Sequence, residues 1–400
     1  MPENNSIKLI KAANEQLVFS IIKKYGSLTK ENIIRKTGLS RPTVISIINL
    51  LIKKSLLMQT GKEKSSVGRI PVLYGINTEK FIIGIDMEYL PVRIAVTDLN
   101  LRIKYNENFC LKPGSDSKAV IKFIINSVKG IISRLDLKME NAVGLGIGLP
   151  GLIDKKNHKS LFIERIAGWK NIQIKKIFSG FSVPVFFGND VHLLAGAEQH
   201  KRQSVHPNFI FIGIRAGIGM GIFYNGKLLS GNMGNAGFIG HAFSEKQSGQ
   251  CTCGKSGCLE ISAGEDAIIK KYCTLTGENF PEKCGYDFYS GFLKKAISSA
   301  DSGEKKTTEI IITAAERIGR AAADASLLFD INTVIIHGNL TRSRLFMNTV
   351  KKNIMLNTPD AKKEIIKIES SALTENEFAL GACVLAAKFL MKNPRLHTGA

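Results

Sequence analysis

Apolar residues recur at helical spacing three times near the start of the chain. The pattern predicts helices over residues 14–25, 30–36 and 41–54, because apolar side chains three or four positions apart line one face of a helix. Thr29 and Ser40 stand where the second and third helices begin, and such residues cap the free N–H groups of a first turn. The side chains expected on the buried faces are Leu17, Val18, Ile21, Ile22, Ile33, Ile34, Ile45, Ile48, Leu51 and Ile52. Helices in this order are typical of helix-turn-helix modules.

Two strand-length apolar runs follow the third helix, at residues 56–60 and 71–76. The segment between them, residues 61–69, is basic and bounded by glycines, which predicts the hairpin of a winged helix. Such a module would contact DNA with the N-terminal part of its third helix and with its wing. The candidate DNA contacts are Ser40, Arg41, Thr43 and Ser46 of the helix, and Lys62, Lys64 and Arg69 of the wing. A small helical bundle used for dimerisation or docking is the alternative.

From residue 81 onwards, short β-branched runs alternate with helical segments. The strand-like runs lie at 81–87, 92–99, 142–151, 183–190, 208–226 and 333–339, and the helical ones at 117–135, 191–200 and 307–325. Two copies of this arrangement, before and after about residue 195, predict two α/β lobes with a cleft between them. The N-terminus is polar and the longest apolar runs have strand length, so we expect no secretory signal, no membrane span and a cytoplasmic location.

Charge is the unusual feature of the composition. With 400 residues, 44% hydrophobic and 22% charged, the chain is long enough for two to four folded domains. Its formal net charge is +21, which favours a polyanionic partner, although a lysine-rich proteome would also produce it. Residues 1–80 hold 14 Lys and Arg against five Asp and Glu. This concentration of positive charge fits a nucleic-acid-binding module at the N-terminus.

Three of the seven cysteines, Cys251, Cys253 and Cys258, fall within eight positions. His241 lies ten residues upstream of the first, and glycines separate the thiols. Three thiolates and an imidazole make a closed four-coordinate Zn²⁺ site, with no position left for a substrate. A disulfide or chance clustering is the alternative, but in a reducing cytosol such spacing favours a metal. We therefore predict one structural zinc ion per chain.

The same segment resembles the signature of the ROK family (repressors, open reading frames, sugar kinases). That signature runs Gly-His, a spacer, and then Cys-x-Cys-Gly-x-x-Gly-Cys-Leu-Glu, and it stands here from Gly240 to Glu260. Residues 68–77, GRIPVLYGIN, also resemble the end of the winged helix of ROK repressors, which ROK kinases lack. The resemblance implies an N-terminal winged helix-turn-helix followed by a two-lobed, actin-like sugar kinase fold. The implied domains are residues 1–78 for the winged helix, 79–195 with the C-terminal helix 374–392 for lobe I, and 196–373 with the zinc knuckle for lobe II.

The two glycine turns that hold ATP phosphates in ROK kinases are altered. The first is Asp-x-Gly-Gly-Thr in the family, whereas residues 86–91 read Asp-Met-Glu-Tyr-Leu-Pro. Glu88 and Tyr89 replace the glycines and Leu90 replaces the threonine, so charge and bulk oppose a phosphate there. The second turn, Gly-Thr-Gly-Ile-Gly-x-Gly, reads Arg-Ala-Gly-Ile-Gly-Met-Gly at residues 215–221. Its glycines remain, which backbone geometry alone explains, but the hydroxyl is gone. We expect no kinase activity and no other enzymatic activity.

Several residues match positions that bind sugar in the family. Asn189 and Asp190 resemble its Asn-Asp pair, Glu260 a second sugar-binding acid, and His241 a residue that touches both zinc and sugar. Without ATP, Asp190 would recognise a sugar hydroxyl rather than act as a base. A helix cap is the alternative role for Asp190.

One departure changes the expected ligand. The family's Ala-Gly-Glu-x-Gly-His reads Ala-Gly-Phe-Ile-Gly-His at residues 236–241, so Phe238 replaces a glutamate that chelates sugar hydroxyls. Either the ligand differs from an ordinary hexose or pyranose, or sensing is lost. Trp169 matches a Gly-Trp turn of the family, where it is equally suited to the core or to stacking on the ligand.

These features together predict a repressor of carbohydrate genes that binds double-stranded operator DNA and senses a sugar or sugar derivative. A homodimer, or a dimer of dimers, would present two winged helices to a palindromic site. A ROK sugar kinase with an appended helical module is one alternative. A ligand-blind regulator controlled by a protein partner is the other.

Overall fold

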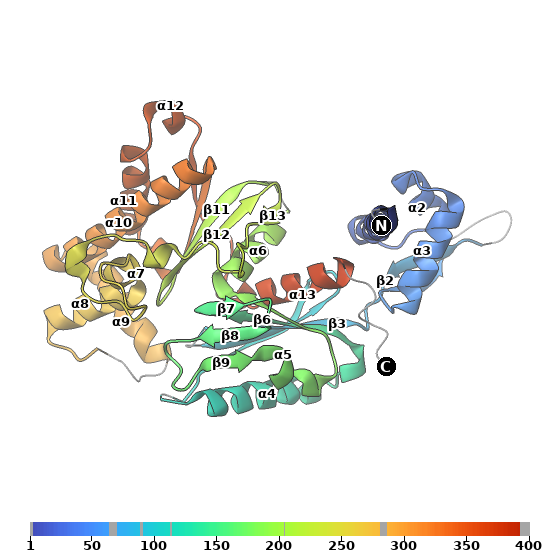
Figure 1. The fold of residues 1–400 in the computed structure, drawn as a ribbon, viewed down its shortest axis with the longest axis horizontal. Helices are drawn as coiled ribbons and strands as arrows, with labels where there is room; N and C mark the ends of the chain where they lie inside the picture. Colours follow the sequence, from blue (N-terminus) through green and yellow to red (C-terminus); the bar gives the residue numbers. More distant parts are fainter. Residues whose placement is uncertain are drawn as a thin grey trace.

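The computed structural model describes residues 3–63, 70–88, 91–112, 114–203, 205–280 and 286–392. An N-terminal module lies at one end of the molecule, and two α/β lobes make up the rest (Figure 1). Lys64 and Arg69 of the expected wing lie outside the described residues, as do Tyr89 and Leu90.

The N-terminal module consists of three helices and a two-stranded sheet, in the order expected of a winged helix. Its elements are α1 (Glu3–Tyr25), α2 (Lys30–Thr37), α3 (Arg41–Lys53), β1 (Leu57–Lys62) and β2 (Val72–Ile76). β1 and β2 pair antiparallel, and Leu28 adds a short bridge to Tyr74. Thr29 accepts a hydrogen bond from the Asn32 N–H and caps α2, and Ser40 caps α3 in the same way. These side-chain caps satisfy N–H groups that the first turn leaves free.

Two details of this module differ from the prediction. α1 begins at Glu3 rather than at residue 14, so the prediction overlooked Ile7 and Ile10, which stand at helical spacing in its first half. On α3 the buried side chains are Val44, Ile47, Ile48 and Leu51, whereas Ile45 is only half-buried. Apolar residues occupy so many positions of α3 that periodicity alone did not fix its buried face.

Lobe I is built on a five-stranded sheet with the order β10-β6-β3-β4-β5. Its strands are β3 (Phe81–Asp86), β4 (Val92–Asp98), β5 (Ile103–Phe109), β6 (Ala142–Leu149) and β10 (Val185–Asn189). α4 (Ser117–Arg134) covers one face, and the C-terminal helix α13 (Leu380–Lys392) packs on β3, β6 and β10 from the other (Figure 1). A three-stranded sheet of β7 (Leu152–Asp154), β8 (Lys159–Phe162) and β9 (Lys170–Gln173), followed by α5 (Ile174–Ile177), lies beside it.

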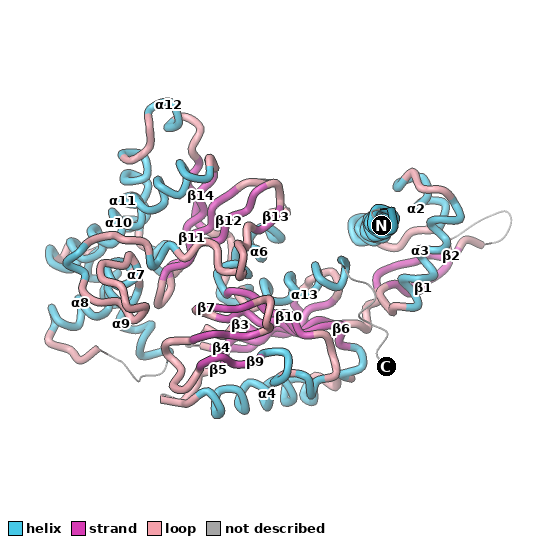
Figure 2. Tube along the Cα trace, in the orientation of Figure 1, coloured by secondary structure: helices cyan, strands magenta, loops and turns pink. Residues whose placement is uncertain are grey.

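Lobe II repeats this arrangement around the order β13-β12-β11-β14-β15. Its strands are β11 (Phe209–Ile214), β12 (Ile218–Tyr224), β13 (Lys227–Leu228), β14 (Thr333–His337) and β15 (Lys367–Ser370). Its helices are α7 (Glu260–Ala263), α8 (Glu265–Thr276), α9 (Tyr286–Asp301), α10 (Lys305–Phe329), α11 (Arg344–Leu356) and α12 (Asp360–Lys363). In chain order, both sheets run antiparallel through their first three strands and add the last two in parallel. Figure 2 shows the strands of both lobes and the helices around them.

The helix α6 (Asp190–Lys201) joins the lobes. It follows the last strand of the lobe I sheet, packs against β11 and β12 of lobe II, and also contacts α13. Its first residue is therefore held between the two sheets, where the cleft was expected.

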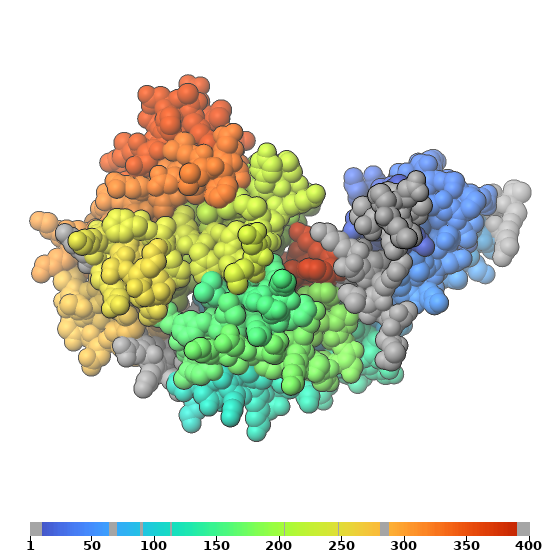
Figure 3. Space-filling view, in the orientation of Figure 1, coloured from blue at the N-terminus to red at the C-terminus, as the bar shows by residue number. Residues whose placement is uncertain are grey.

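The N-terminal module shares a buried apolar cluster with lobe I. The cluster includes Val18 and Ile22 of α1 together with Ile82 of β3 and Val384 of α13. The module nevertheless projects from the body of the molecule (Figure 3). Within the described part of the chain, no helix combines the length and apolar character needed to cross a membrane.

Candidate functional site

His241, Cys251, Cys253 and Cys258 form a cluster at the edge of lobe II. Their ligand atoms all lie within 4.8 Å of one another. The Cys253 and Cys258 sulfurs are 3.6 Å apart, and the Cys251 sulfur is 3.7 Å from Nδ1 of His241. Tetrahedral zinc with Zn–S bonds of about 2.3 Å separates its sulfur ligands by about 3.7 Å. The donor set therefore fits a metal ion as predicted.

The backbone of this knuckle explains how three thiols converge. The Cys251 N–H donates to the carbonyl of Lys255, and Phe243 pairs with Cys258 in a short bridge. Gly257 has a φ of 77°, which a side chain would strain. Burial and the neighbouring thiols raise the pKa of Cys258 to about 12, because a thiolate would lie beside other sulfurs without a counter-ion. A bound dication supplies that counter-ion and reverses the shift.

Asn189 and Asp190 lie at the junction of β10 and α6. Asn189 Oδ1 accepts a hydrogen bond from the His192 N–H at 3.2 Å, so Asn189 rather than Asp190 caps the helix. Both residues are buried, with 9% and 8% of their surface exposed. Asp190 Oδ1 accepts from the Val191 N–H, and its Oδ2 accepts from Arg215. Burial raises the pKa of Asp190 to about 6, although Arg215 opposes the shift.

Arg215 is a buried residue at this site that sequence reasoning did not single out. It follows β11 directly and donates through Nη1 to Asp86 at 3.1 Å and to Glu88 at 2.8 Å. Arg93 on β4 donates to the same two carboxylates, at 3.2 Å and 2.6 Å. We call these residues, Asp86, Glu88, Arg93, Asp190 and Arg215, the ionic cluster. The sequence showed both charged residues of this pairing: Glu88 stands in the first altered glycine turn and Arg215 in the second.

Glu260 stands at the start of α7, beside the second glycine turn. Its Oε2 accepts a hydrogen bond from the Ile218 N–H at 3.2 Å. A Cβ on Gly217 would lie 2.2 Å from the same oxygen, and a Cβ on Gly219 would lie 2.8 Å from Val191 of α6. Neither glycine has a positive φ. The prediction that backbone geometry keeps these glycines was wrong: close packing requires them.

The structure also links Glu260 and Asp190 through one short segment of chain. Arg215 binds Asp190, and Gly217 and Ile218 bind or contact Glu260. Glu260 lies close enough to His241 that the imidazole acts on its pKa, which burial raises.

Phe238 lies over the imidazole of His241. The ring centroids are 5.7 Å apart and the planes differ by 15°, so the rings stack. The backbone around Phe238 is fixed, because Gly237 accepts a hydrogen bond from the Met220 N–H and the Ala236 carbonyl contacts His192 Nε2 at 2.5 Å. Trp169 is a core residue, since it is 1% exposed and its indole N–H donates to Ser160 Oγ.

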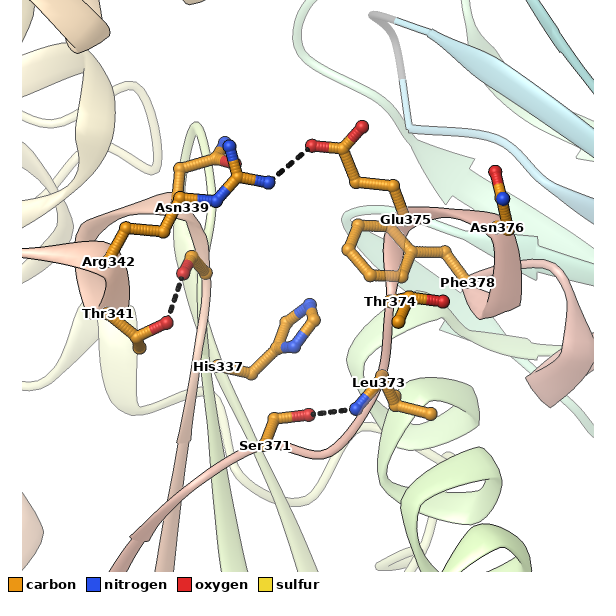
Figure 4. A pocket seen from close by; sticks show the side chains of 11 residues that line it. His337, Asn339, Thr341, Arg342, Ser371, Leu373, Thr374, Glu375, Asn376 and Phe378 are labelled. Atoms are coloured by element: carbon orange, nitrogen blue, oxygen red, sulfur yellow. Dashed lines mark hydrogen bonds and ion pairs between the residues drawn. The ribbon is translucent and has the colours of Figure 1, made fainter.

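A cavity of about 440 Å³ lies between the end of β14 and the segment that leads to α13 (Figure 4). Its lining includes His337, Arg342, Glu375 and Phe378, and the Arg342–Glu375 ion pair at 2.9 Å spans it. The five residues expected to contact sugar are not among those that line it. The guanidinium carbon of Arg93 lies 4.6 Å from the ring centroid of Phe378, so the cavity lies next to the ionic cluster.

Among the expected DNA contacts, those that the structure describes lie at the surface of the N-terminal module. Arg41 and Ser46 are exposed, and Thr43 is half-buried and hydrogen-bonded to Ser40 Oγ at 2.8 Å. Arg41 pairs with Glu31 of α2 at 3.2 Å, with 69% and 59% of the two side chains exposed. Lys62 is exposed at the end of β1. An exposed ion pair of this kind is weak, so it leaves Arg41 free to contact a phosphate or a base.

Comparison with known proteins identifies the family. The model of the ROK family matches residues 82–389, so the chain belongs to the ROK family. The xylose repressor of Caldicellulosiruptor bescii is 26% identical, over 96% of this chain and 98% of that protein.

Solved structures agree on the fold. A ROK family transcriptional regulator, described as a homologue of the E. coli MLC protein, matches with a TM-score of 0.80 and 21% identity, covering 98% of this chain and 100% of that one. A ROK family glucokinase from Streptomyces griseus, solved with glucose and AMPPNP, matches with a TM-score of 0.63 and 22% identity. This match covers 77% of the present chain and 98% of the glucokinase. The winged helix followed by an actin-like sugar kinase fold is thus the architecture of this chain.

Proposed function

We propose that the chain is a DNA-binding transcriptional repressor of carbohydrate genes whose kinase-like body senses a sugar. The observation that carries the proposal is the combination of a DNA-binding type of module with an altered kinase-like body. A winged helix is fused to a sugar-kinase fold in which charged side chains pair with each other where the family's phosphate turns lie. The xylose repressor, similar over nearly the whole chain, supports the same function.

The DNA-binding part is residues 1–78 in this proposal. Its third helix would enter the major groove with Ser40, Arg41, Thr43 and Ser46, and Lys62, Lys64 and Arg69 would hold the backbone or the minor groove. The exposure of Arg41, Ser46 and Lys62 supports this assignment. A homodimer would place two such helices on the two halves of a palindromic operator.

The effector part consists of lobe I, residues 79–195 with 374–392, and lobe II, residues 196–373. The proposed sugar contacts are Asn189, Asp190, Phe238, His241 and Glu260. Asp190, His241 and Glu260 offer acceptors or donors for hydroxyl groups, whereas Phe238 offers an apolar face. The sugar expected is therefore one that presents a less hydroxylated or substituted edge to Phe238.

The metal held by His241, Cys251, Cys253 and Cys258 would be structural zinc. Four protein ligands close the coordination shell, so the ion would fix the loop that carries His241 rather than activate a substrate. Catalysis is not expected of this body. Arg215 binds the carboxylate of Asp190, the residue that resembles the family's catalytic base, and Glu88 places a negative charge in the first phosphate turn.

Two assays on the purified chain test the proposal. DNA bound by the full chain should be selected from a random pool, and its affinity should change when the effector sugar is added. ATP turnover with D-glucose or D-xylose should not exceed that of protein-free buffer. Sugar-dependent ATP turnover without selective DNA binding would make the chain a kinase with an appended module.

A further inference from the structure

The ionic cluster joins the two lobes through a single side chain. Asp86, Glu88 and Arg93 belong to the first two strands of lobe I and the loop between them, whereas Arg215 follows the first strand of lobe II. Arg215 is only 6% exposed and contacts three carboxylates at once. Its third partner, Asp190, begins the helix that connects the lobes.

The charges of the cluster do not cancel. Three carboxylates, Asp86, Glu88 and Asp190, face two guanidinium groups, and both guanidinium groups contact Asp86 and Glu88. Asp190 has Arg215 as its charged partner in the cluster, because the contacts of Arg93 go to the other two acids. A buried carboxylate beside two others remains ionised only if a cation stays next to it.

We propose that Arg215 is a positioning residue of the effector site, which holds Asp190 ionised and fixed at the start of α6 and couples that geometry to the contact between the two lobes. The proposal rests on the proposed function, because it takes Asp190 as a sugar contact. Arg215, directly after the first strand of lobe II, thereby connects that strand to the end of the first strand of lobe I.

Both Asp190 oxygens keep acceptor capacity in this arrangement. Oδ1 receives one backbone N–H and Oδ2 receives one guanidinium N–H, whereas each carboxylate oxygen has two lone pairs. A sugar hydroxyl therefore adds to the contact with Arg215 and does not replace it. Ligand binding and the Arg215 contact between the lobes then stabilise each other, since both need the same carboxylate in the same place.

Substitution of Arg215 should reveal itself in the pH profile of sugar binding. The charged groups around it are Asp86, Glu88, Arg93 and Asp190, with Glu265 and His337 nearby. In R215M, Asp190 loses its cation while Asp86 and Glu88 still repel its charge, so it is protonated at neutral pH and accepts hydroxyl protons poorly. Alkaline pH would ionise it again.

The experiment is calorimetric titration of the full chain with D-xylose, and separately with D-glucose, at pH 7 and pH 9. We expect wild-type affinity for the bound sugar to be the same at the two pH values within about twofold. The sugar affinity of R215M should be at least about tenfold lower than that of the wild type at pH 7 and should partly recover at pH 9. The affinity of R215K should lie between those of R215M and the wild type. Equal affinities for R215M and wild type, or a loss that pH 9 does not relieve, would overturn the proposal.

Arg202 provides a matched control. It also lies in an ion-pair cluster of lobe II, with Glu198 and Glu369, but it follows the C-terminus of α6, about 18 Å along the helix from Asp190. R202M should lower the melting temperature without introducing a pH dependence of sugar affinity. A pH profile for R202M like that of R215M would also count against the proposal.

If neither sugar binds, melting temperatures test the role of Arg215 instead. That outcome agrees with a Phe238 that disfavours unmodified aldoses, and Arg215 is then judged by a cycle of E88Q, R215M and the double variant. If Arg215 connects the lobes, E88Q should lower the melting temperature of R215M by less than it lowers that of the wild type, because Glu88 then has only Arg93 as its partner in the ionic cluster. Additive losses in melting temperature would overturn the connection. If R215M does not fold, R215K replaces it, and a melting temperature and an affinity equal to wild type would contradict the proposal.

Discussion

At the residue scale, the two glycine turns of this chain differ from those of ROK kinases in a few side chains. Glu88 and Arg215 stand in the two phosphate turns and bind each other at 2.8 Å. Each replacement was visible in the sequence as a lost glycine or hydroxyl. Their pairing was not predicted, because residues 127 positions apart show no relation in a single sequence.

Phe238 is expected to decide which sugars bind. F238E should strengthen the binding of an unmodified aldose such as D-glucose by about 1.5–3 kcal/mol, because a carboxylate accepts hydroxyl protons and a phenyl ring does not. Calorimetry on folded protein measures this. Tight binding of glucose by the wild type, or an F238E variant with unchanged affinity for every sugar, would place Phe238 away from the ligand.

Glu265 should make stability depend on pH. Burial raises its pKa to about 8 from an ordinary value of 4.5, so the folded chain binds a proton that the unfolded chain releases between these values. The wild type should therefore lose stability relative to E265Q as the pH rises from 4.5 to 8. Urea unfolding of both proteins across this range measures the difference, and a difference that is constant or grows with pH in favour of the wild type would contradict it.

At the element scale, local signals predicted the N-terminal module well. Thr29, Gly38 and Ser40 mark helix ends in the sequence, and the structure places caps at all three. Caps and turns depend on neighbouring residues, so a sequence reveals them. The helices α9 and α11 of lobe II were not anticipated, and for α11 the prediction overlooked a local signal, since Ser343 caps its first turn.

The loop from His241 to Cys258 is the element whose sequence signal was most specific, and the structure brings its four candidate metal ligands together. C253S should lower the melting temperature and weaken DNA binding, because a site that has lost a thiolate holds zinc poorly and loosens the loop that carries His241. C110S, at an exposed cysteine outside the cluster, is the control. Protein purified without chelator should contain one zinc ion per chain by elemental analysis. Protein that contains no zinc would contradict this prediction.

The third helix and the strand after it should bind DNA in different ways. R41A should reduce affinity for the selected site more than for random DNA. K62A should weaken both equally and flatten the salt dependence by about one unit of slope, as expected for one phosphate contact. K129A, at an exposed position of α4, is the control. Fluorescence anisotropy over a range of salt concentrations distinguishes these effects, and equal losses on both DNAs for R41A would refute its role in specificity.

At the scale of the whole molecule, a path of packed elements connects the proposed effector site to the DNA-binding module. Asp190 begins α6, α6 packs against α13, and α13 contacts α1 of the module. The two-lobed fold followed from the alternation of strands and helices and from the ROK resemblance. This path did not, because it depends on how the last helix of the chain packs against the first.

The most direct test of the account is the binding of selected DNA by the full chain with and without effector. We predict that the full chain binds one selected sequence at least about a thousandfold more tightly than random DNA, that R41A loses most of this preference, and that the bound sugar changes the affinity. A chain that shows no preference among sequences, or whose preference is unchanged when residues 1–78 are deleted, would contradict the account.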